Sequence, residues 1–145
     1  MSVLSLVRLT PVERRLEGLT EATVALLSED VQTIRTEVKV AGICPAPLVP
    51  MVLQVAHEMV DNAVRHGMRL RLIGQISVSL CSFPGNRVNL TVRDDGWGPG
   101  SVKPGEGHSI MASLAGQFGG SVSLTRKGSW TLATMTIQNR LRLKA

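Results

Sequence analysis

The sequence predicts an α+β fold in which helices cover one face of a mixed, mostly antiparallel sheet. Helical periodicity of apolar residues occurs from residue 11 to about 35 and over 47–66 and 109–118. Strand-like segments occur at 37–40, 75–81, 87–93, 121–125 and 130–137. The turn sequence Phe83-Pro84-Gly85-Asn86 joins two of these segments and predicts a hairpin. Amphipathic helices beside half-buried strands indicate a two-layer sandwich.

Length and composition fit one globular unit. The chain has 145 residues, 43% of them apolar, and no Pro/Ser-rich linker, repeat or low-complexity tract. We expect a helical segment at 1–36 and the globular domain at 37–145. No run approaches 18 apolar residues and no signal-peptide pattern occurs, so we expect a cytoplasmic protein without a membrane span. Cys44 and Cys81 have no neighbouring ligand pattern and are expected to be free thiols.

The first helix is expected to begin at Thr10-Pro11-Val12-Glu13, which has the pattern of a capping box with proline at the first helical position. Apolar residues at helical spacing continue to about Arg35, with a break near Ser28. This apolar stripe must be covered. It packs on the sheet of its own domain, it forms a contact in a homodimer, or it is the remnant of a helix that precedes the domain.

The helix predicted over 47–66 carries two stripes. The apolar stripe consists of Leu48, Val52, Val55, Met59 and Ala63. Beside it, Glu58, Asn62 and Arg65 lie at i, i+4 and i+7 and are aimed at a common point. A carboxylate polarises water, an amide oxygen can join the ligand shell of Mg²⁺, and a guanidinium suits phosphate. These residue types indicate a metal-nucleotide site, whereas each alone is usually part of a solvated face.

Two glycine-rich turns follow. Asp94-x-Gly96-x-Gly98 comes at the end of a predicted strand, where a carboxylate can accept a hydrogen bond from an exocyclic amine and glycine permits close backbone approach. Gly105-x-Gly107 precedes the helix at 109–118, and free amides at a helix start attract an anion. Each motif alone is usually only a turn, but their order and spacing together predict a nucleotide pocket.

These motifs resemble those of the GHKL ATPase superfamily, which includes gyrase-type topoisomerases, heat-shock chaperones, histidine kinases and anti-sigma-factor serine kinases. Segment 57–67 is similar to the N box, 92–98 to the first glycine box, and 105–122 to the second glycine box with its following strand. The strongest likeness is to the histidine-kinase catalytic domain or the anti-sigma-factor kinase. The resemblance implies a Bergerat-type fold that binds ATP with Mg²⁺.

The resemblance also implies roles for individual residues. Asn62 would hold Mg²⁺, Glu58 would be the general base or water-orienting carboxylate, and Asp94 would read the adenine amine. The walls of the pocket would be shaped by Gly96, Gly98, Gly105 and Gly107.

The remaining candidates are basic. Arg65 and His66 would lie near the phosphates, and Lys103 would reach a phosphate as a flexible point charge. His108 stands where the family commonly has an aliphatic residue beneath the triphosphate loop. Only residues 99–104 separate the two glycine boxes, so any lid is short.

The resemblance predicts the ATP-binding domain of a bacterial-type signalling kinase, histidine-kinase-like or anti-sigma type, that phosphorylates or regulates a partner in trans. The partner would be a phosphoacceptor domain, a response regulator or an anti-sigma antagonist. The alternative is a degenerate nucleotide-binding or interaction module that regulates a signalling partner without ATP turnover, which the short lid and His108 favour.

Nucleic-acid binding is a weaker alternative. The net charge of +5 fits it, but the Arg and Lys residues are scattered and no basic-aromatic stacking motif accompanies them. We therefore expect no specific nucleic acid among the partners.

Overall fold

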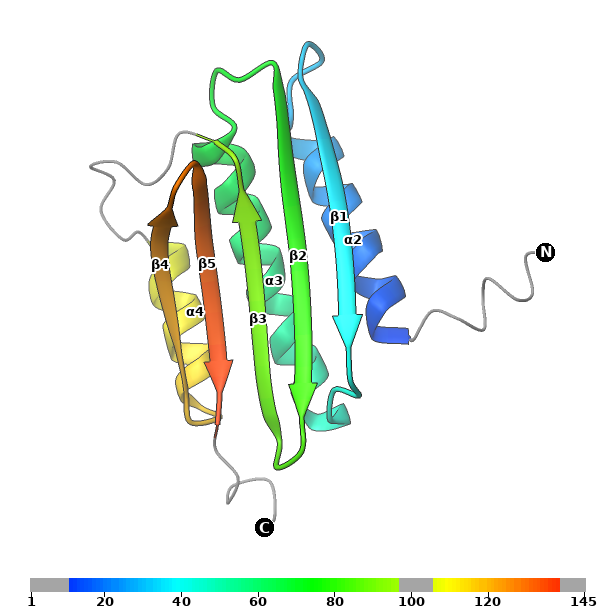
Figure 1. Ribbon diagram of the computed structural model, residues 1–145, viewed down its shortest axis with the longest axis vertical. Helices are drawn as coiled ribbons and strands as arrows, with labels where there is room; N and C mark the ends of the chain where they lie inside the picture. The colour runs from blue at the N-terminus through cyan, green and yellow to red at the C-terminus, as the bar shows by residue number, and fades with distance from the viewer. Residues whose placement is uncertain (1–10, 97–105, 139–145) are drawn as a thin grey trace, which may run out of the picture.

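The computed structural model describes residues 11–96 and 106–138, which form a sheet covered on one face by helices (Figure 1). The longer helices are α2 (Pro11–Leu27), α3 (Val49–Asn62) and α4 (Glu106–Gly116). A short 3₁₀ turn, η1 (Ala46–Leu48), precedes α3, and a π-helical segment, η2 (Ala63–Gly67), continues it. The strands are β1 (Thr33–Ala41), β2 (Ile73–Phe83), β3 (Arg87–Asp94), β4 (Gly120–Lys127) and β5 (Trp130–Ile137).

The strand order is β1-β2-β3-β5-β4. β1 and β2 are parallel, with α3 in the connection between them, and the other three pairs are antiparallel. The predicted hairpin turn joins β2 to β3, with Gly85 and Asn86 in the left-handed region at φ 85° and 60°. The predicted mixed, mostly antiparallel sheet with helices on one face is confirmed.

The core lies between the helices and the inner face of the sheet. The predicted apolar stripe of the second helix is buried there, since Leu48, Val52, Val55, Met59 and Ala63 are all at most 5% exposed. The central strands contribute inward-facing residues at every second position, including Val78, Leu80, Val88, Leu90 and Val92. Helix periodicity and strand alternation therefore meet in a single apolar layer.

The first helix is shorter than expected. α2 ends at Leu27, and β1 begins at Thr33, so the predicted continuation to Arg35 is wrong whereas the break near Ser28 is correct. Ile34 lies on the half-buried face of β1, and Arg35 lies on its exposed face. All nine residues of β1 pair with β2, and this pairing replaces the helical hydrogen bonds. The predicted capping residue Thr10 lies outside the described residues.

α2 lies beside α3 in the helix layer and packs on β1 of the sheet. Its fully buried Leu16 belongs to the same core as the α3 stripe. The boundary predicted between residues 36 and 37 falls within β1. A homodimer contact through this helix stays a prediction. No helix in residues 11–96 or 106–138 combines the length and the apolar character needed to span a bilayer.

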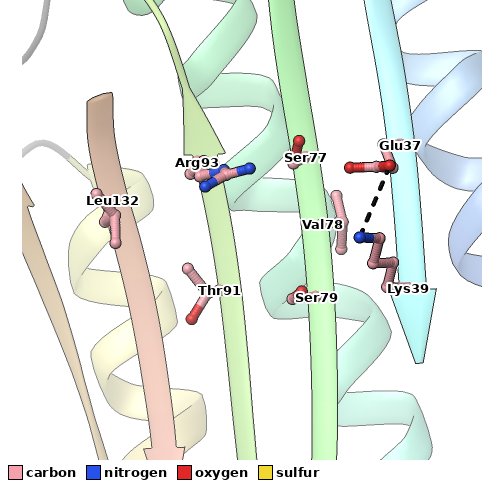
Figure 2. A pocket seen from close by; sticks show the side chains of 8 residues that line it. All are labelled: Glu37, Lys39, Ser77, Val78, Ser79, Thr91, Arg93 and Leu132. Atoms are coloured by element: carbon pink, nitrogen blue, oxygen red, sulfur yellow. Dashed lines mark ion pairs between the residues drawn. The ribbon is translucent and has the colours of Figure 1, made fainter. Parts of the chain in front are cut away.

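The opposite face of the sheet is polar and, within the described residues, carries no helix (Figure 1). A hollow on this face is lined by Glu37, Lys39, Ser77, Ser79, Thr91, Arg93 and Leu132, and it also borders the buried core residue Val78 (Figure 2). Lys39 Nζ lies 3.9 Å from Glu37 Oε2, and the guanidinium of Arg93 stacks over the ring of Trp130. Hydroxyl and charged side chains allow this face to meet water. None of the lining residues is among those predicted to bind nucleotide.

Packing of α2 on the core can be tested by truncating one side chain. Leu16→Ala should lower the free energy of unfolding by about 2–5 kcal/mol, because Leu16 is fully buried and its removal leaves a cavity. Leu26→Ala is the matched control on the same helix, since Leu26 is 82% exposed. Urea unfolding measures the free energy of unfolding of both variants. Equal, small losses would contradict the packing of α2 on this core.

Candidate nucleotide-binding site

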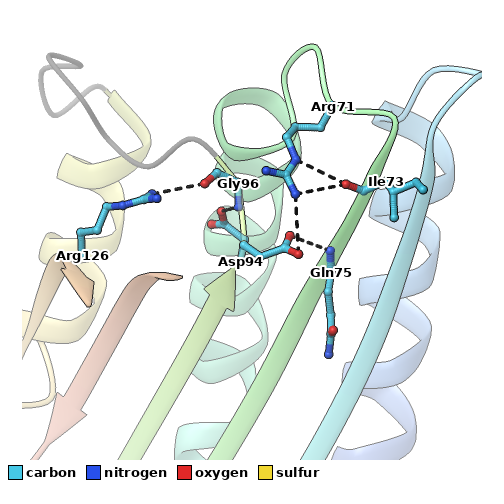
Figure 3. Close-up of polar contacts among 7 residues, drawn as sticks. Arg71, Ile73, Gln75, Asp94, Gly96 and Arg126 are labelled. Atoms are coloured by element: carbon cyan, nitrogen blue, oxygen red, sulfur yellow. Dashed lines mark hydrogen bonds and ion pairs between the residues drawn. The ribbon is translucent and has the colours of Figure 1, made fainter. Parts of the chain in front are cut away.

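Asp94 is the last residue of β3, and its carboxylate lies against Gly67 at the end of the helix that covers the sheet. It is only 5% exposed, and its Oδ1 accepts a hydrogen bond of 2.9 Å from the backbone N–H of Gly96 (Figure 3). Burial raises the pKa of the Asp94 carboxyl. The Gly96 hydrogen bond and the charges of Arg126 and Arg71 oppose this increase, while the charge of Asp95 adds to it. The site therefore holds a desolvated acceptor.

The backbone at the end of the π-helical segment lies directly against Asp94. A Cβ atom at Gly67 would overlap the Asp94 carboxylate, and a Cβ atom at Gly96 would overlap the Gly67 carbonyl. Both positions therefore require glycine for close approach. Gly96 was predicted to shape the nucleotide pocket. The structure places it against Gly67 and Asp94, and its contact with nucleotide stays a prediction. The contribution of Gly67 was missed, although it ends the segment that resembles the N box.

Glu58 and Asn62 lie one turn apart on α3, and both are partly buried. Their predicted placement on the same side of the helix follows from the uninterrupted α-helix between Val49 and Asn62. Glu58 Oε2 lies 3.6 Å from Nδ1 of the more exposed His57. That these two residues contact metal and phosphate stays a prediction.

Arg65 and His66 are exposed and belong to η2. The Nε of Arg65 donates to Asp61 Oδ1 at 2.6 Å, an i,i+4 ion pair. Met68 N–H bonds to the carbonyl of Ala63, five residues earlier, because the turn is π-helical. The α-helical spacing of 3.6 residues per turn therefore applies between Glu58 and Asn62. It does not apply between Asn62 and Arg65, which lies in the π-helical turn. Phosphate contacts by Arg65 and His66 stay predictions.

Asp95 is held from the β2 side. Its Oδ1 accepts from Gln75 N–H at 2.9 Å, and its Oδ2 lies 3.7 Å from Arg71 Nη2. Arg71 also donates to the carbonyl of Ile73 (Figure 3). The sequence interpretation treated Asp95 as part of a turn and did not identify Arg71 or Gln75. Only the adjacent carboxylates Asp94-Asp95 hinted at a polar network there.

The loop between η2 and β2 is fastened from a distant part of the chain. The amide Nε2 of Gln32 donates to the carbonyls of Met68 and Arg71 at 2.7 and 2.8 Å. Leu70, with φ 63°, lies in the left-handed region within this loop. These contacts fix the loop that carries Arg71 toward Asp95.

The β5 side of the Asp94 turn is held by Arg126 on β4. Its Nη1 donates to the Gly96 carbonyl at 3.2 Å and to Thr131 Oγ1 at 3.1 Å. Thr131 is buried and lies opposite Asp94 in the β3–β5 register. Neither residue was identified from the sequence, because each lies more than 30 residues from Asp94.

The other predicted residues fall in or beside the gap in the described chain. Gly98, Lys103 and Gly105 lie outside the described residues. Gly107 and His108 belong to the first turn of α4, which begins at Glu106 rather than at residue 109. Their proposed contacts with nucleotide stay predictions.

The side chains in this region fit a magnesium ion that is held mainly by the phosphates of a bound nucleotide and by water. In the described ranges no group of three or more His, Cys, Asp or Glu residues is placed to hold a metal ion. Mg²⁺ usually keeps several waters and takes one or two protein oxygens together with substrate phosphates. The partly buried amide oxygen of Asn62 is of the chemical type that such a shell accepts.

Comparison with known proteins supports the assignment of the fold. No profile of a known protein family matches the chain. Over 91 residues, 60% of this chain, the sequence is 31% identical to the nitrate/nitrite sensor protein NarQ of Escherichia coli (strain K12). The chain spans only 15% of the length of NarQ.

Two solved structures are similar to nearly the whole chain. The blue-light activated histidine kinase of Erythrobacter litoralis EL346 superposes with a TM-score of 0.78 and 21% identity, covering 96% of this chain and 45% of that one. The catalytic domain of the histidine kinase ThkA gives a TM-score of 0.63 and 16% identity, covering 88% and 91%. The chain therefore has the fold of a histidine kinase catalytic domain, and the predicted resemblance to this branch of the GHKL superfamily is confirmed for the fold.

The close approach at Gly67 can be tested by adding one methyl group. Gly67→Ala should lower the free energy of unfolding by about 1–3 kcal/mol, because the new Cβ collides with the Asp94 carboxylate. Gly18→Ala is the matched control, since a Cβ there meets nothing within 4 Å. The control should raise stability by about 0.5–1 kcal/mol through helix propensity. The contact would be refuted if thermal or urea unfolding showed that Gly67→Ala is more stable than Gly18→Ala.

Burial of Asp94 predicts a dependence of stability on pH. Its pKa is raised above the ordinary 3.8, so the folded state binds the proton more tightly than the unfolded state. The contribution of Asp94 to stability therefore falls as pH rises from 3.8 through the higher pKa of the folded state. Asp94→Asn removes this dependence. The stability of the variant relative to wild type should increase with pH across that window in urea unfolding, and a constant difference would count against a buried, raised-pKa carboxyl.

Proposed function

We propose that this chain is the ATP-binding domain of a signalling protein kinase and that it binds Mg-ATP beside α3, with the nucleobase at the end of β3. The observation that carries this proposal is the buried Asp94 carboxylate beneath the glycine backbone of Gly67 and Gly96. A desolvated carboxylate at a strand end is costly unless hydrogen-bond donors reach it. A ligand that supplies such a donor is therefore favoured.

Asp94 would select the base. Gly96 N–H already donates to Oδ1, and a carboxylate accepts several hydrogen bonds. The exocyclic amine of adenine supplies a further donor. A base with a carbonyl at that position would place acceptor against acceptor in a desolvated site, which is strongly unfavourable. The site should therefore prefer adenine nucleotides over those of hypoxanthine or guanine.

Glu58 and Asn62 would serve the triphosphate end. Both lie N-terminal to Gly67 on the helix that passes the base site, so phosphates and base would contact successive turns. The magnesium ion would neutralise phosphate charge when bound, with Asn62 as its protein ligand. Glu58 would orient the attacking hydroxyl, imidazole or water and accept its proton.

The nucleophile would come from a partner. The likeness to histidine kinases and to NarQ supports a phosphoacceptor on another domain or protein, with a response regulator downstream. An anti-sigma antagonist with an acceptor serine is the second kind of partner that the motifs allow. Because ATP is the substrate, we place the domain in the cytoplasm.

Nucleotide binding can be tested by calorimetric titration of ATP and ADP with Mg²⁺. Wild type should bind both, and Asp94→Asn should weaken binding by roughly ten-fold or more, because the variant loses a charged acceptor for the amine. Circular dichroism checks that both proteins are folded. Absence of binding by folded wild type would refute the proposal.

Phosphoryl transfer to a candidate partner then separates the kinase from a module without turnover. Asn62→Ala should abolish Mg-ATP-dependent transfer and leave ADP binding without Mg²⁺ near the wild-type value. If wild type binds ATP yet releases no ADP with any phosphoacceptor domain, the alternative of a regulatory module without turnover is supported instead.

A further inference from the structure

Arg126 occupies a specific place relative to Asp94. In the sheet register Arg126 on β4 pairs with Thr131 on β5, and Thr131 pairs with Asp94 on β3. Residues paired directly across neighbouring strands project from the same face of a sheet. The three side chains therefore form one row on the helix-covered face, running from the edge strand to the end of the central strand.

The contacts of Arg126 converge on the Asp94 turn. One guanidinium nitrogen, Nη1, carries two hydrogens and donates to two acceptors, the Gly96 carbonyl and Thr131 Oγ1. The N–H of the same Gly96 donates to Asp94 Oδ1 (Figure 3). Arg126 thus holds the residue that in turn holds the carboxylate. A charged donor makes a stronger hydrogen bond than a neutral one.

We infer that Arg126 is a positioning residue that fixes the Asp94–Gly96 turn in the orientation needed to bind the nucleobase amine. This inference rests on the proposed function. Arg126 acts through Gly96 and contributes no contact to the base itself. It also ties the β4–β5 hairpin to the base site, so the edge of the sheet takes part in nucleotide recognition.

The positive charge of Arg126 also affects the pKa of the Asp94 carboxyl. The charges that act on Asp94 are those of Asp95, Arg126 and Arg71. Arg126 and Arg71 lower the pKa of the Asp94 carboxyl, whereas Asp95 raises it. Removal of Arg126 would therefore raise this pKa further. If nucleotide binding requires the ionised carboxylate, binding by the variant without Arg126 would be lost at a higher pH than binding by wild type.

The first test uses the protein without nucleotide. Arg126→Ala should shift the NMR signal of the Gly96 amide and raise the pKa of Asp94 measured by carboxyl titration. Arg126→Lys keeps the charge and should leave that pKa closer to wild type. Lys127→Ala is the matched control, because Lys127 is the neighbouring cation on β4 and alternation directs it to the opposite face. An unchanged Gly96 signal and Asp94 pKa in Arg126→Ala would overturn the inference.

The second test uses ATP and a double-mutant cycle. Arg126→Ala should weaken ATP binding by roughly ten-fold, the effect of one charged hydrogen bond, and Arg126→Lys should restore part of it. In the Asp94→Asn background the same change should have little effect, because the carboxylate that Arg126 positions through Gly96 is already lost. Equal losses in both backgrounds would overturn the inference and show that Arg126 only ties β4 to β5. Failure of wild type to bind ATP would refute the proposed function, and the nucleotide-free test would still decide the role of Arg126 in fixing the turn.

Discussion

The end of the π-helical segment lies against the end of the central strand, and the rest of the site depends on this contact. Gly67 leaves room for the Asp94 carboxylate, and Gly96 leaves room for the Gly67 carbonyl. Without side chains at these two positions, helix and strand approach closely enough to bury the carboxylate. That burial sets the raised pKa of Asp94 and its demand for hydrogen-bond donors. The same close packing of helix and strand therefore gives Asp94 the buried position from which we propose that it binds the nucleobase.

The order of the strands explains how the Asp94 turn is held. β3 lies between β2 and β5, so the turn at its end is held from both sides of the sheet. The backbone N–H of Gln75 on β2 donates to Asp95 Oδ1, and Arg126, which reaches past β5 from β4, donates to the Gly96 carbonyl. Each contact joins residues distant in sequence, and each restrains a different residue of the turn. A desolvated carboxylate stays in one orientation only when its surroundings are restrained in this way.

The residues that stabilise the fold and those proposed to bind nucleotide lie in different parts of the structure. The apolar layer between sheet and helices contains Leu16, Val55 and Leu80, all fully buried, and it provides the stability. The buried Asp94 opposes folding when it is ionised. Polar and strained features that carry function are usually tolerated because the remaining core compensates for them. The hydroxyl-rich outer face of the sheet lies on the other side from this core, and its side chains meet water.

The sequence by itself determined the layers, the hairpin turn at Gly85-Asn86, and the placement of Glu58 and Asn62 on one helix, because these follow from local periodicity and turn chemistry. It also predicted Asp94 and Gly96 as neighbours in the nucleotide site. The structure joins them by a hydrogen bond, while their contact with nucleotide stays a prediction. The residues around Ile34 fit either a helix or a strand, and only pairing with β2 decided for β1. Likewise, the contacts of Arg126 and the close approach of Gly67 arise from strand register and helix packing. Such contacts join distant residues, and no local pattern encodes them.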